Sequence, residues 1–409
     1  MASRNNSIVA PLPDSVVKKH GVKTIESNNA ITGAQNLTLK QSILPVCLVT
    51  ILFFLWGFAY GLLDVLNAHF QTALNITKGQ SGGLQAAYFG AYAIGPLTYS
   101  GWIVRRFGYR WAFITGLCIY GVGALMFWPS GLKRSFGGFC GSGIAIFVFI
   151  LAVVFFFAPI PEVTDADMAA QAASSGTETA FEDKPLSKQY TLFFGVAAQF
   201  CYVGAQCAYA GYFINYVSAV RPGTTHATGA NLLAVAQGCF AIGRFIASGL
   251  LKITKPRLVI MGFLSGVVLF ACLTMGLKGN AGIASISLVL FFESCVFPLI
   301  FALSIRGLGR HSKRGASFIV AAVSGGALFP PVLGTVADHI GTQKAFFIPL
   351  IGFVIAWCFP LYLNLFKAKS LDGWTEEKAP VVAEKDVESM HDDDDEKKGA
   401  AIEHQEIRA

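Results

Sequence analysis

Charged side chains are distributed very unevenly along this chain of 409 residues, and this restricts its fold more than any other feature. Of the 55 Asp, Glu, Lys and Arg residues, 35 lie in three segments, residues 1–42, 160–189 and 367–409. The other 294 residues contain only three acids, Asp64, Glu293 and Asp338. Overall 54% of residues are hydrophobic and 13% are charged, whereas typical soluble domains are about 25% charged. We therefore expect an all-α, polytopic membrane protein with polar tails and one polar central loop.

Ten apolar runs are long enough to be spans, because a helix of about 20 apolar residues crosses a bilayer. They lie near 43–66, 82–104, 111–129, 139–159, 190–218, 228–252, 256–277, 281–305, 315–337 and 343–366. The predicted parts are a disordered cytosolic tail (1–42), an N-terminal helical half of four spans (43–159), a cytosolic central loop (160–189), a C-terminal helical half of six spans (190–366) and an acidic, disordered cytosolic tail (367–409).

The distribution of Lys and Arg predicts the orientation. With both termini in the cytosol, the inner segments carry 24 of these residues and the outer loops carry 6. Cytosolic loops are the ones enriched in Lys and Arg, so we expect both termini inside. The net charge of +7 comes from a basic apolar body and acidic polar segments, which suits lipid headgroups rather than nucleic acid. We expect a monomer in the plasma membrane.

Several kinds of site are not indicated. The nine cysteines form no CxxC pair, so the sequence predicts neither a disulfide framework nor a metal site. A GxxxxGK[ST] phosphate loop and the hydrolase patterns HExxH and GxSxG are also absent. We expect a protein that is not an enzyme and holds no cofactor.

Asp64 is a candidate proton carrier. A charged side chain inside lipid is costly unless it faces protein or a water-filled cavity, so such residues are usually functional. Tyr60, Asp64 and Asn67 share one helix face by their i, i+4, i+7 spacing. Tyr60 and Asn67 are therefore candidate substrate contacts. In the alternative interpretation, Asp64 lies at the outer end of its helix and simply meets water.

Glu293 and Arg244 are the other charged side chains of interest within predicted spans. Glu293 has no neighbouring counter-charge in sequence, so it is either a second proton-coupling group or a neutral hydrogen-bonding one. Arg244 lies two turns from Lys252. We interpret it as a structural charge that extends toward the headgroups or braces neighbouring helices.

Amide and phenol side chains form stripes that suit a neutral, hydroxylated ligand. Gln199, Tyr202, Gln206 and Tyr209 occupy one face of the fifth predicted span. The other candidate substrate contacts are Gln85, Asn231 and Gln237. Such groups hydrogen-bond hydroxyls in both directions, but they also join helices to one another.

Several motifs together resemble the fucose permease group of the major facilitator superfamily. Phe53–Trp56 leading to Asp64 resembles the first helix of that family, and Ala198–Gln206 resembles the seventh. Ile242–Phe245 is similar to the eighth. The tenth and eleventh are matched by Phe297-Pro298, Gly307–Gly309, Gly315–Val320 and Gly325–Ala327.

The resemblance implies a twelve-helix sugar–proton symporter in which Asp64 is a proton-coupling acid. Tyr60, Gly61 and Leu63 stand where family members often carry asparagines. Phe127–Pro129 resembles the end of helix 3, yet 139–159 resembles helix 6. Helices 4 and 5 are therefore missing from this prediction, and with them the family's helix-4 glutamate. The alternative function is a non-transporting sensor or scaffold, or an inactive truncated product.

Overall fold

The structure, a computed structural model, describes residues 39–73, 75–125, 148–157, 185–308, 311–368 and 371. Within these ranges every regular element is a helix and none is a strand, which agrees with the all-α prediction. Most of both tails, most of the central loop and the segment 126–147 lie outside the described residues. The chain divides into two compact units, Met1–Tyr362 and Leu363–Ala409.

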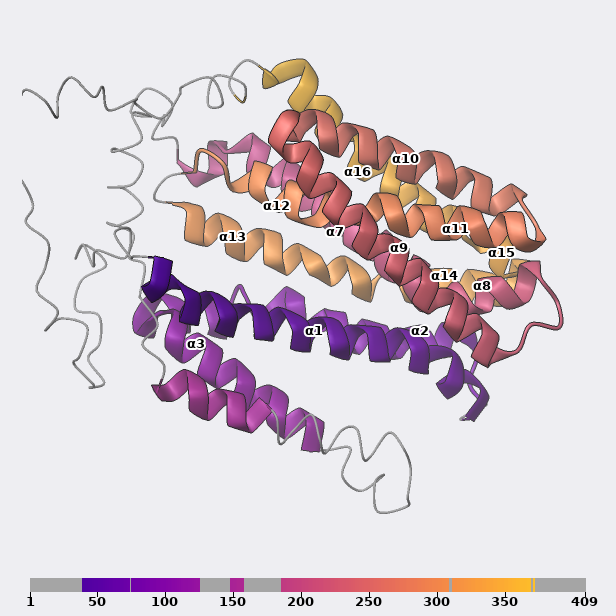
Figure 1. Ribbon diagram of the computed structural model, residues 1–409, viewed down its shortest axis with the longest axis horizontal. Helices are drawn as coiled ribbons and strands as arrows, with labels where there is room; N and C mark the ends of the chain where they lie inside the picture. The colour runs from indigo at the N-terminus through magenta and orange to yellow at the C-terminus, as the bar shows by residue number, and fades with distance from the viewer. Residues whose placement is uncertain are drawn as a thin grey trace, which may run out of the picture. The chain divides into compact units, whose positions relative to one another are not determined.

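The helices of the chain follow in the order shown in Figure 1. Before the central loop they are α1 (Leu39–Ala73), α2 (Lys78–Ile94), α3 (Tyr99–Leu125) and an unlabelled helix, Val148–Phe157. After it come the 3-10 helix η4 (Leu186–Lys188), α7 (Tyr190–Gly211), α8 (Phe213–Val220), α9 (His226–Ile253), α10 (Pro256–Gly276), α11 (Gly279–Glu293), α12 (Val296–Ile305), α13 (Ser312–Ala321), the 3-10 helix η6 (Ala322–Ala327), α14 (Phe329–Ile340), α15 (Thr342–Ala345) and α16 (Phe347–Phe366).

Six helical stretches among the described residues are long and apolar enough to cross a membrane. They are Tyr190–Gly211, His226–Ile253, Pro256–Gly276, Gly279–Ile305, Ser312–Ile340 and Thr342–Phe366. Each coincides with one of the six spans predicted for the C-terminal half. Three shorter apolar helices precede them: Ile43–Phe58, Arg110–Leu125 and Val148–Phe157. The predicted total of ten spans is therefore not reached within the described part of the chain.

The predicted single span 82–104 is interrupted, and a proline explains the interruption. Pro96 has no N–H to donate to a preceding carbonyl, and α2 ends at Ile94. The N–H of Ser100, the second residue of α3, bonds the carbonyl of Gly95 at 3.1 Å, five residues back. A second interruption lies within α3 at Gly108, whose φ of 85° is not helical. This glycine lies between the predicted spans 82–104 and 111–129.

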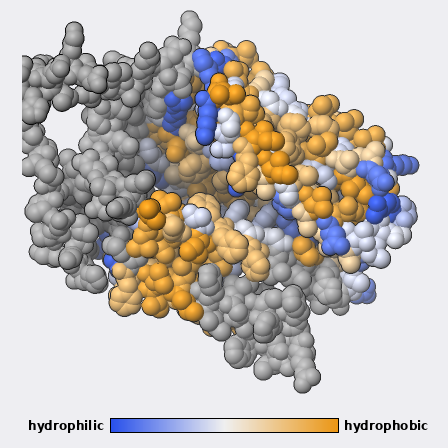
Figure 2. All heavy atoms as spheres, in the orientation of Figure 1, coloured by the Kyte–Doolittle hydropathy of each residue, from blue (hydrophilic) through white to orange (hydrophobic). Residues whose placement is uncertain are grey.

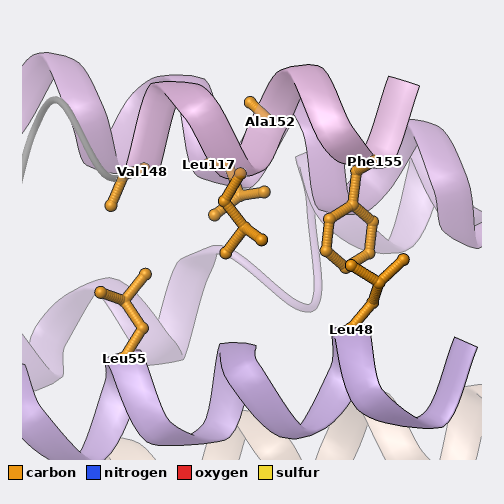
Figure 3. Close-up of a cluster of buried hydrophobic side chains, with 7 residues drawn as sticks. Leu48, Leu55, Leu117, Val148, Ala152 and Phe155 are labelled. Atoms are coloured by element: carbon orange, nitrogen blue, oxygen red, sulfur yellow. The ribbon is translucent and has the colours of Figure 1, made fainter. Parts of the chain in front are cut away.

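The helices before the central loop have a small apolar core of their own. Leu48 and Leu55 of α1 pack against Leu117 of α3 and against one face of the helix Val148–Phe157, including Phe155 (Figure 3). On the face shown in Figure 2, much of the exposed surface of the helices is hydrophobic, with some hydrophilic residues among it. Phe53 and Phe54, for example, are each 70% exposed. Exposed apolar surface of this extent suits contact with lipid.

Small residues let α2 approach α14 closely. A Cβ atom on Gly82 would lie only 2.5 Å from the Cα of Pro331, and one on Gly79 would lie 2.8 Å from Oγ1 of Thr335. Glycine removes the side chain that would hold two helix backbones apart. The helix pair therefore depends on glycine at these positions.

We predict that Gly82→Ala destabilises the packed arrangement of α2 and α14 by roughly 1–3 kcal/mol, the usual penalty for overpacking. The neighbouring Gly83 is a matched control, because nothing lies within 4 Å of the position its Cβ would take. Thermal unfolding of the purified protein in detergent should show a lower Tm for Gly82→Ala than for Gly83→Ala. Equal values would contradict the close packing.

Candidate functional site

A network of side-chain hydrogen bonds joins α1 and α2 to the α7–α8 region. The amide of Asn67 donates to the carbonyl of Gly211 at 2.8 Å and accepts from the hydroxyl of Ser81. Gln71 donates to Ser81 at 2.9 Å, and Asn215 donates to Gln71 at 2.7 Å. Helices from both sides of the central loop thus share a polar contact at which Asn67 and Ser81 are fully buried.

A second contact surrounds the first turn of α2. The carboxylate of Asp338, on α14, accepts the N–H of Gly79 at 3.0 Å. Lys78 donates to Thr342 at 2.9 Å, and the hydroxyl of Tyr212 donates to the carbonyl of Lys78 at 2.7 Å. A carboxylate at the N-terminus of a helix is stabilised by the helix dipole. One of the three acids of the apolar body therefore holds two parts of the fold together.

The other two acids are buried on different helices. Asp64 of α1 is 2% exposed and Glu293, the last residue of α11, is 1% exposed. Both carboxylate oxygens of Asp64 and Oε1 of Glu293 have no hydrogen-bond partner among the described residues. Tyr60 and Cys207 each interact electrostatically with both acids. The two carboxyl groups are thus brought to one region around α7.

The polar stripe predicted on α7 faces inward. Gln199, Tyr202 and Tyr209 are buried and Gln206 is half-buried. The hydroxyl of Tyr202 donates to the backbone carbonyl of Glu293 at 2.8 Å. Both polar atoms of the Gln199 amide, and the hydroxyl of Tyr209, lack a partner among the described residues. Part of the stripe therefore joins helices, and part consists of buried polar atoms without a partner among the described residues.

Aromatic rings from α1 and α2 cluster around Tyr60, which lies one turn before Asp64. Trp56 stacks on Tyr60 with ring centroids 5.8 Å apart, and Tyr60 meets the edge of Phe89 at 5.9 Å. The indole of Trp56 donates to the hydroxyl of Tyr92 at 2.7 Å, and Tyr92 lies 6.2 Å from Tyr88. The hydroxyl of Tyr60 has no partner among the described residues. Such rings offer apolar faces beside polar groups.

The remaining predicted contacts are divided between buried and exposed positions. Gln85 of α2 is 1% exposed, and neither polar atom of its amide has a partner among the described residues. On α9, Gln237 is half-buried and Asn231 is exposed. Tyr60, Asp64, Gln85, Gln199 and Glu293 therefore share one property, buried polar atoms without a partner among the described residues, whereas Asn231 lies on a surface.

Three residues of this region were not singled out from the sequence. Cys207 is buried beside both acids, but a lone cysteine in an apolar helix carries no signal of its own. Gln71 and Ser81 take part in the hydrogen-bond network. Gln71 lies one turn beyond Asn67 on the same helix face, and this spacing is the signal that could have identified it. The eight described cysteines are free, and no group of metal-binding side chains occurs among the described residues.

Comparison with known proteins shows which chains this one is similar to. No family model matches it. It is 27% identical to the L-fucose-proton symporter of Escherichia coli K12, with 78% of this chain and 93% of that protein covered. It is also 27% identical to a glucose/galactose transporter of Brucella abortus (strain 9-941), with 79% of this chain and 93% of that protein covered.

Among solved structures, the chain is similar to FucP, a transporter of the major facilitator superfamily in its outward conformation. The TM-score is 0.61 at 25% identity, and the match covers 79% of this chain and 99% of that chain. The relatives are transporters and not enzymes, which agrees with the expectation from sequence. The predicted fold, a helical bundle of the major facilitator type, is supported by this likeness.

We predict that Asn67→Ala makes Cys207 more reactive toward a membrane-impermeant maleimide. The variant removes the donor to the carbonyl of Gly211 and the acceptor of the Ser81 hydroxyl. A loss of roughly 1 kcal/mol would raise the population of separated helices about fivefold. The rate of modification at Cys207 is measured by mass spectrometry.

Two controls belong to this measurement. Thr72 is exposed on the same helix, and its hydroxyl donates to the carbonyl of Ala68 within that helix, so Thr72→Ala should leave the rate unchanged. Cys295, buried within the helices after the central loop, serves as an internal reference. Equal acceleration at Cys207 and Cys295 would indicate general unfolding and contradict the prediction.

Proposed function

Because the chain is a fucose permease-like protein of the major facilitator superfamily, we propose that it carries a neutral sugar of the fucose or hexose type across a membrane together with a proton. The observation that carries the proposal is the pair of buried acids, Asp64 and Glu293, near a buried amide stripe. Titratable groups inside a membrane protein are expensive and usually functional.

Asp64 is the proposed proton-loading group. Its two oxygens have no protein partner among the described residues, so a proton can occupy either one without breaking an existing contact. Tyr60 and Cys207 are among the described groups near it, and neither of these two side chains carries a positive charge. A carboxyl group placed this way changes the local charge when it gains or loses a proton, which couples protonation to the state of the site.

The sugar is proposed to bind at the face of α7 that carries Gln199. Gln85 of α2, which lies against Gly211 at the end of α7, is proposed as a second contact. Each side-chain amide offers two donors and an acceptor, and neither amide has a partner among the described residues. Tyr202 and Gln206 extend the α7 face, and Tyr60 is proposed to contribute from α1. Asn67 would contribute only after its bonds to Gly211 and Ser81 separate. Gln237 and the exposed Asn231 on α9 remain predictions from the sequence. Aromatic rings of α1 and α2 would cover the apolar face of the sugar ring.

Transport is proposed to follow from movement of the helices before the central loop against those after it. In the described structure the contacts at Asn67 and at the first turn of α2 join these two groups. A sugar that enters past the contacts at Asn67 and at the first turn of α2 would reach Gln199 only after these contacts separate. We also propose that both termini are cytosolic, and that the protein acts as a monomer in the plasma membrane with the proton as its coupling ion.

A second candidate function is that of a membrane sensor, scaffold or inactive product that lacks helices 4 and 5 of the family. The alignment with the E. coli symporter extends over 409 positions. This chain also has 409 residues, but only 78% of them are aligned. The relative therefore contributes more residues to the alignment than this chain does, which supports a missing segment. Genomic DNA between the codons for Pro129 and Phe139 should be read for an in-frame segment that encodes two helices.

We predict that the purified protein in proteoliposomes accumulates L-fucose or D-galactose when a proton gradient is imposed, and that Asp64→Asn abolishes accumulation. Asn cannot exchange a proton, so the coupling is lost while the packing volume is kept. Exchange of sugar at equal concentrations should persist in the variant and serves as its control. Absence of any uptake by the unaltered chain, unchanged in Asp64→Asn, would contradict transport and favour the second candidate.

We predict opposite effects of Gln199→Leu on stability and on sugar binding. Removing a buried amide without a partner should raise the free energy of unfolding by roughly 1–3 kcal/mol, while the lost sugar contacts should raise the Kd for sugar about tenfold. Thermal unfolding and calorimetric titration with sugar measure the two quantities. Gln206→Leu is the matched comparison, because this half-buried residue should give a smaller gain in stability. A Gln199→Leu protein that binds sugar normally would contradict the proposed site.

A further inference from the structure

The apolar stretch Gly279–Ile305 is broken in its middle. Helix α11 ends at Glu293 and α12 begins at Val296, with Ser294 and Cys295 between them. The cause lies four residues beyond Ser294, at Pro298. In a continuous helix the N–H of residue 298 would bond the carbonyl of residue 294, but proline has no N–H and its ring crowds that carbonyl.

The break releases backbone carbonyls within an apolar helix, where no water can satisfy them and each is costly. Side chains from two other helices bond these carbonyls. The hydroxyl of Tyr202, on α7, donates to the carbonyl of Glu293 at 2.8 Å. Nε of Arg244, on α9, donates to the carbonyl of Ser294 at 3.0 Å. The regular amide bonds resume beyond the break, where Leu299 donates to Cys295 at 3.2 Å.

The surroundings of Arg244 are shaped for this contact. The preceding residue, Gly243, is buried, and a Cβ there would lie 2.5 Å from the carbonyl oxygen of Phe291 and 2.6 Å from Oγ of Ser294. Glycine therefore lets α9 lie directly against the break. The guanidinium carbon of Arg244 also lies 5.0 Å from the ring centroid of Phe240, one turn earlier, where a cation is attracted to the aromatic face.

We infer that Arg244 and Tyr202 are positioning residues: they replace the backbone hydrogen bonds lost at the Pro298 break and so hold the carboxyl group of Glu293 in the proposed site. The inference rests on the proposed function in one respect only, that Glu293 belongs to the transport site. The guanidinium group is suited to the task because it is always protonated and presents rigid N–H donors. Although Arg244 is exposed, its role differs from that of a charge reaching the headgroups, since its Nε donates to the carbonyl of the fully buried Ser294.

The first experiment measures stability and does not require transport. Thermal unfolding in detergent is compared for the unaltered chain, Arg244→Gln, Pro298→Ala and the double variant. An alanine at this position supplies the missing N–H to the carbonyl of Ser294. Arg244→Gln should therefore lower the Tm clearly when Pro298 is kept, and much less when it is combined with Pro298→Ala. Equal decreases in both backgrounds, or no decrease in either, would overturn the inference.

Tyrosine variants test the second carbonyl with a matched control on the same helix. Tyr202→Phe removes the hydroxyl that bonds Glu293, whereas Tyr209→Phe removes a buried hydroxyl that has no partner among the described residues. We expect a lower Tm for Tyr202→Phe and an unchanged or higher Tm for Tyr209→Phe. The same decrease in Tm in both variants would contradict a specific stabilising role for the hydrogen bond from Tyr202 to the carbonyl of Glu293.

The second experiment asks whether the break positions Glu293 for the sugar. In sugar exchange across proteoliposomes, Arg244→Gln should raise the KM several-fold, and Arg244→Lys, which retains a charged donor, should restore much of it. Pro298→Ala should also raise the KM although it stays folded, because a continuous helix turns Glu293 away from its position. An unchanged KM in folded Pro298→Ala would refute the positioning role. If neither the unaltered chain nor any variant transports sugar, the proposed function is wrong. The Tm comparison still tests the role of Arg244 at the break in that case.

Discussion

The structure depends on one physical requirement: a polar group surrounded by apolar side chains must find a hydrogen-bond partner within the protein. Each interruption of a helix releases such groups. After Pro96 the N–H of Ser100 reaches back to Gly95, and at the break before Pro298 the released carbonyls are bonded by Tyr202 and Arg244. The breaks therefore decide where polar side chains on neighbouring helices must lie, and they link local sequence to tertiary packing.

The same requirement separates the three acids of the apolar body by role. Asp338 bonds the first turn of α2 and has its partner supplied by the fold. Asp64 and Glu293 are buried, yet they retain oxygens without a partner among the described residues. An acid with a partner stabilises one arrangement of the helices. An acid without one remains free to bind a proton or a ligand, and this contrast is the strongest structural support for a transport site around α7.

Much of the fold could be predicted, and the site only in part. The six spans predicted from residue 190 onward coincide with six helical stretches that are long and apolar enough to cross a membrane, because apolar length alone identifies such a stretch. The span 82–104 was predicted as one helix, but Pro96 divides it. Helical spacing placed Gln199 and Tyr202 on one face, and both are buried. The same spacing could not distinguish Gln199, whose amide is unpartnered, from Tyr202, whose hydroxyl bonds the carbonyl of Glu293. Spacing shows which side chains share a helix face, but not which helix packs against that face.

The sequence by itself determined that this chain is a helical membrane protein, since three acids among 294 apolar-body residues are compatible with no other class. Its motifs also indicated the fucose permease-like group, which the comparisons support. Only the tertiary structure decided which polar residues hold the helices together and which stay available. Asn67 bonds Gly211, 144 residues away, and Arg244 bonds Ser294, 50 residues away. Hydrogen bonds between residues so far apart in sequence depend on how helices pack against one another. The periodicity of a single helix shows only which residues share a face, so it does not predict that packing.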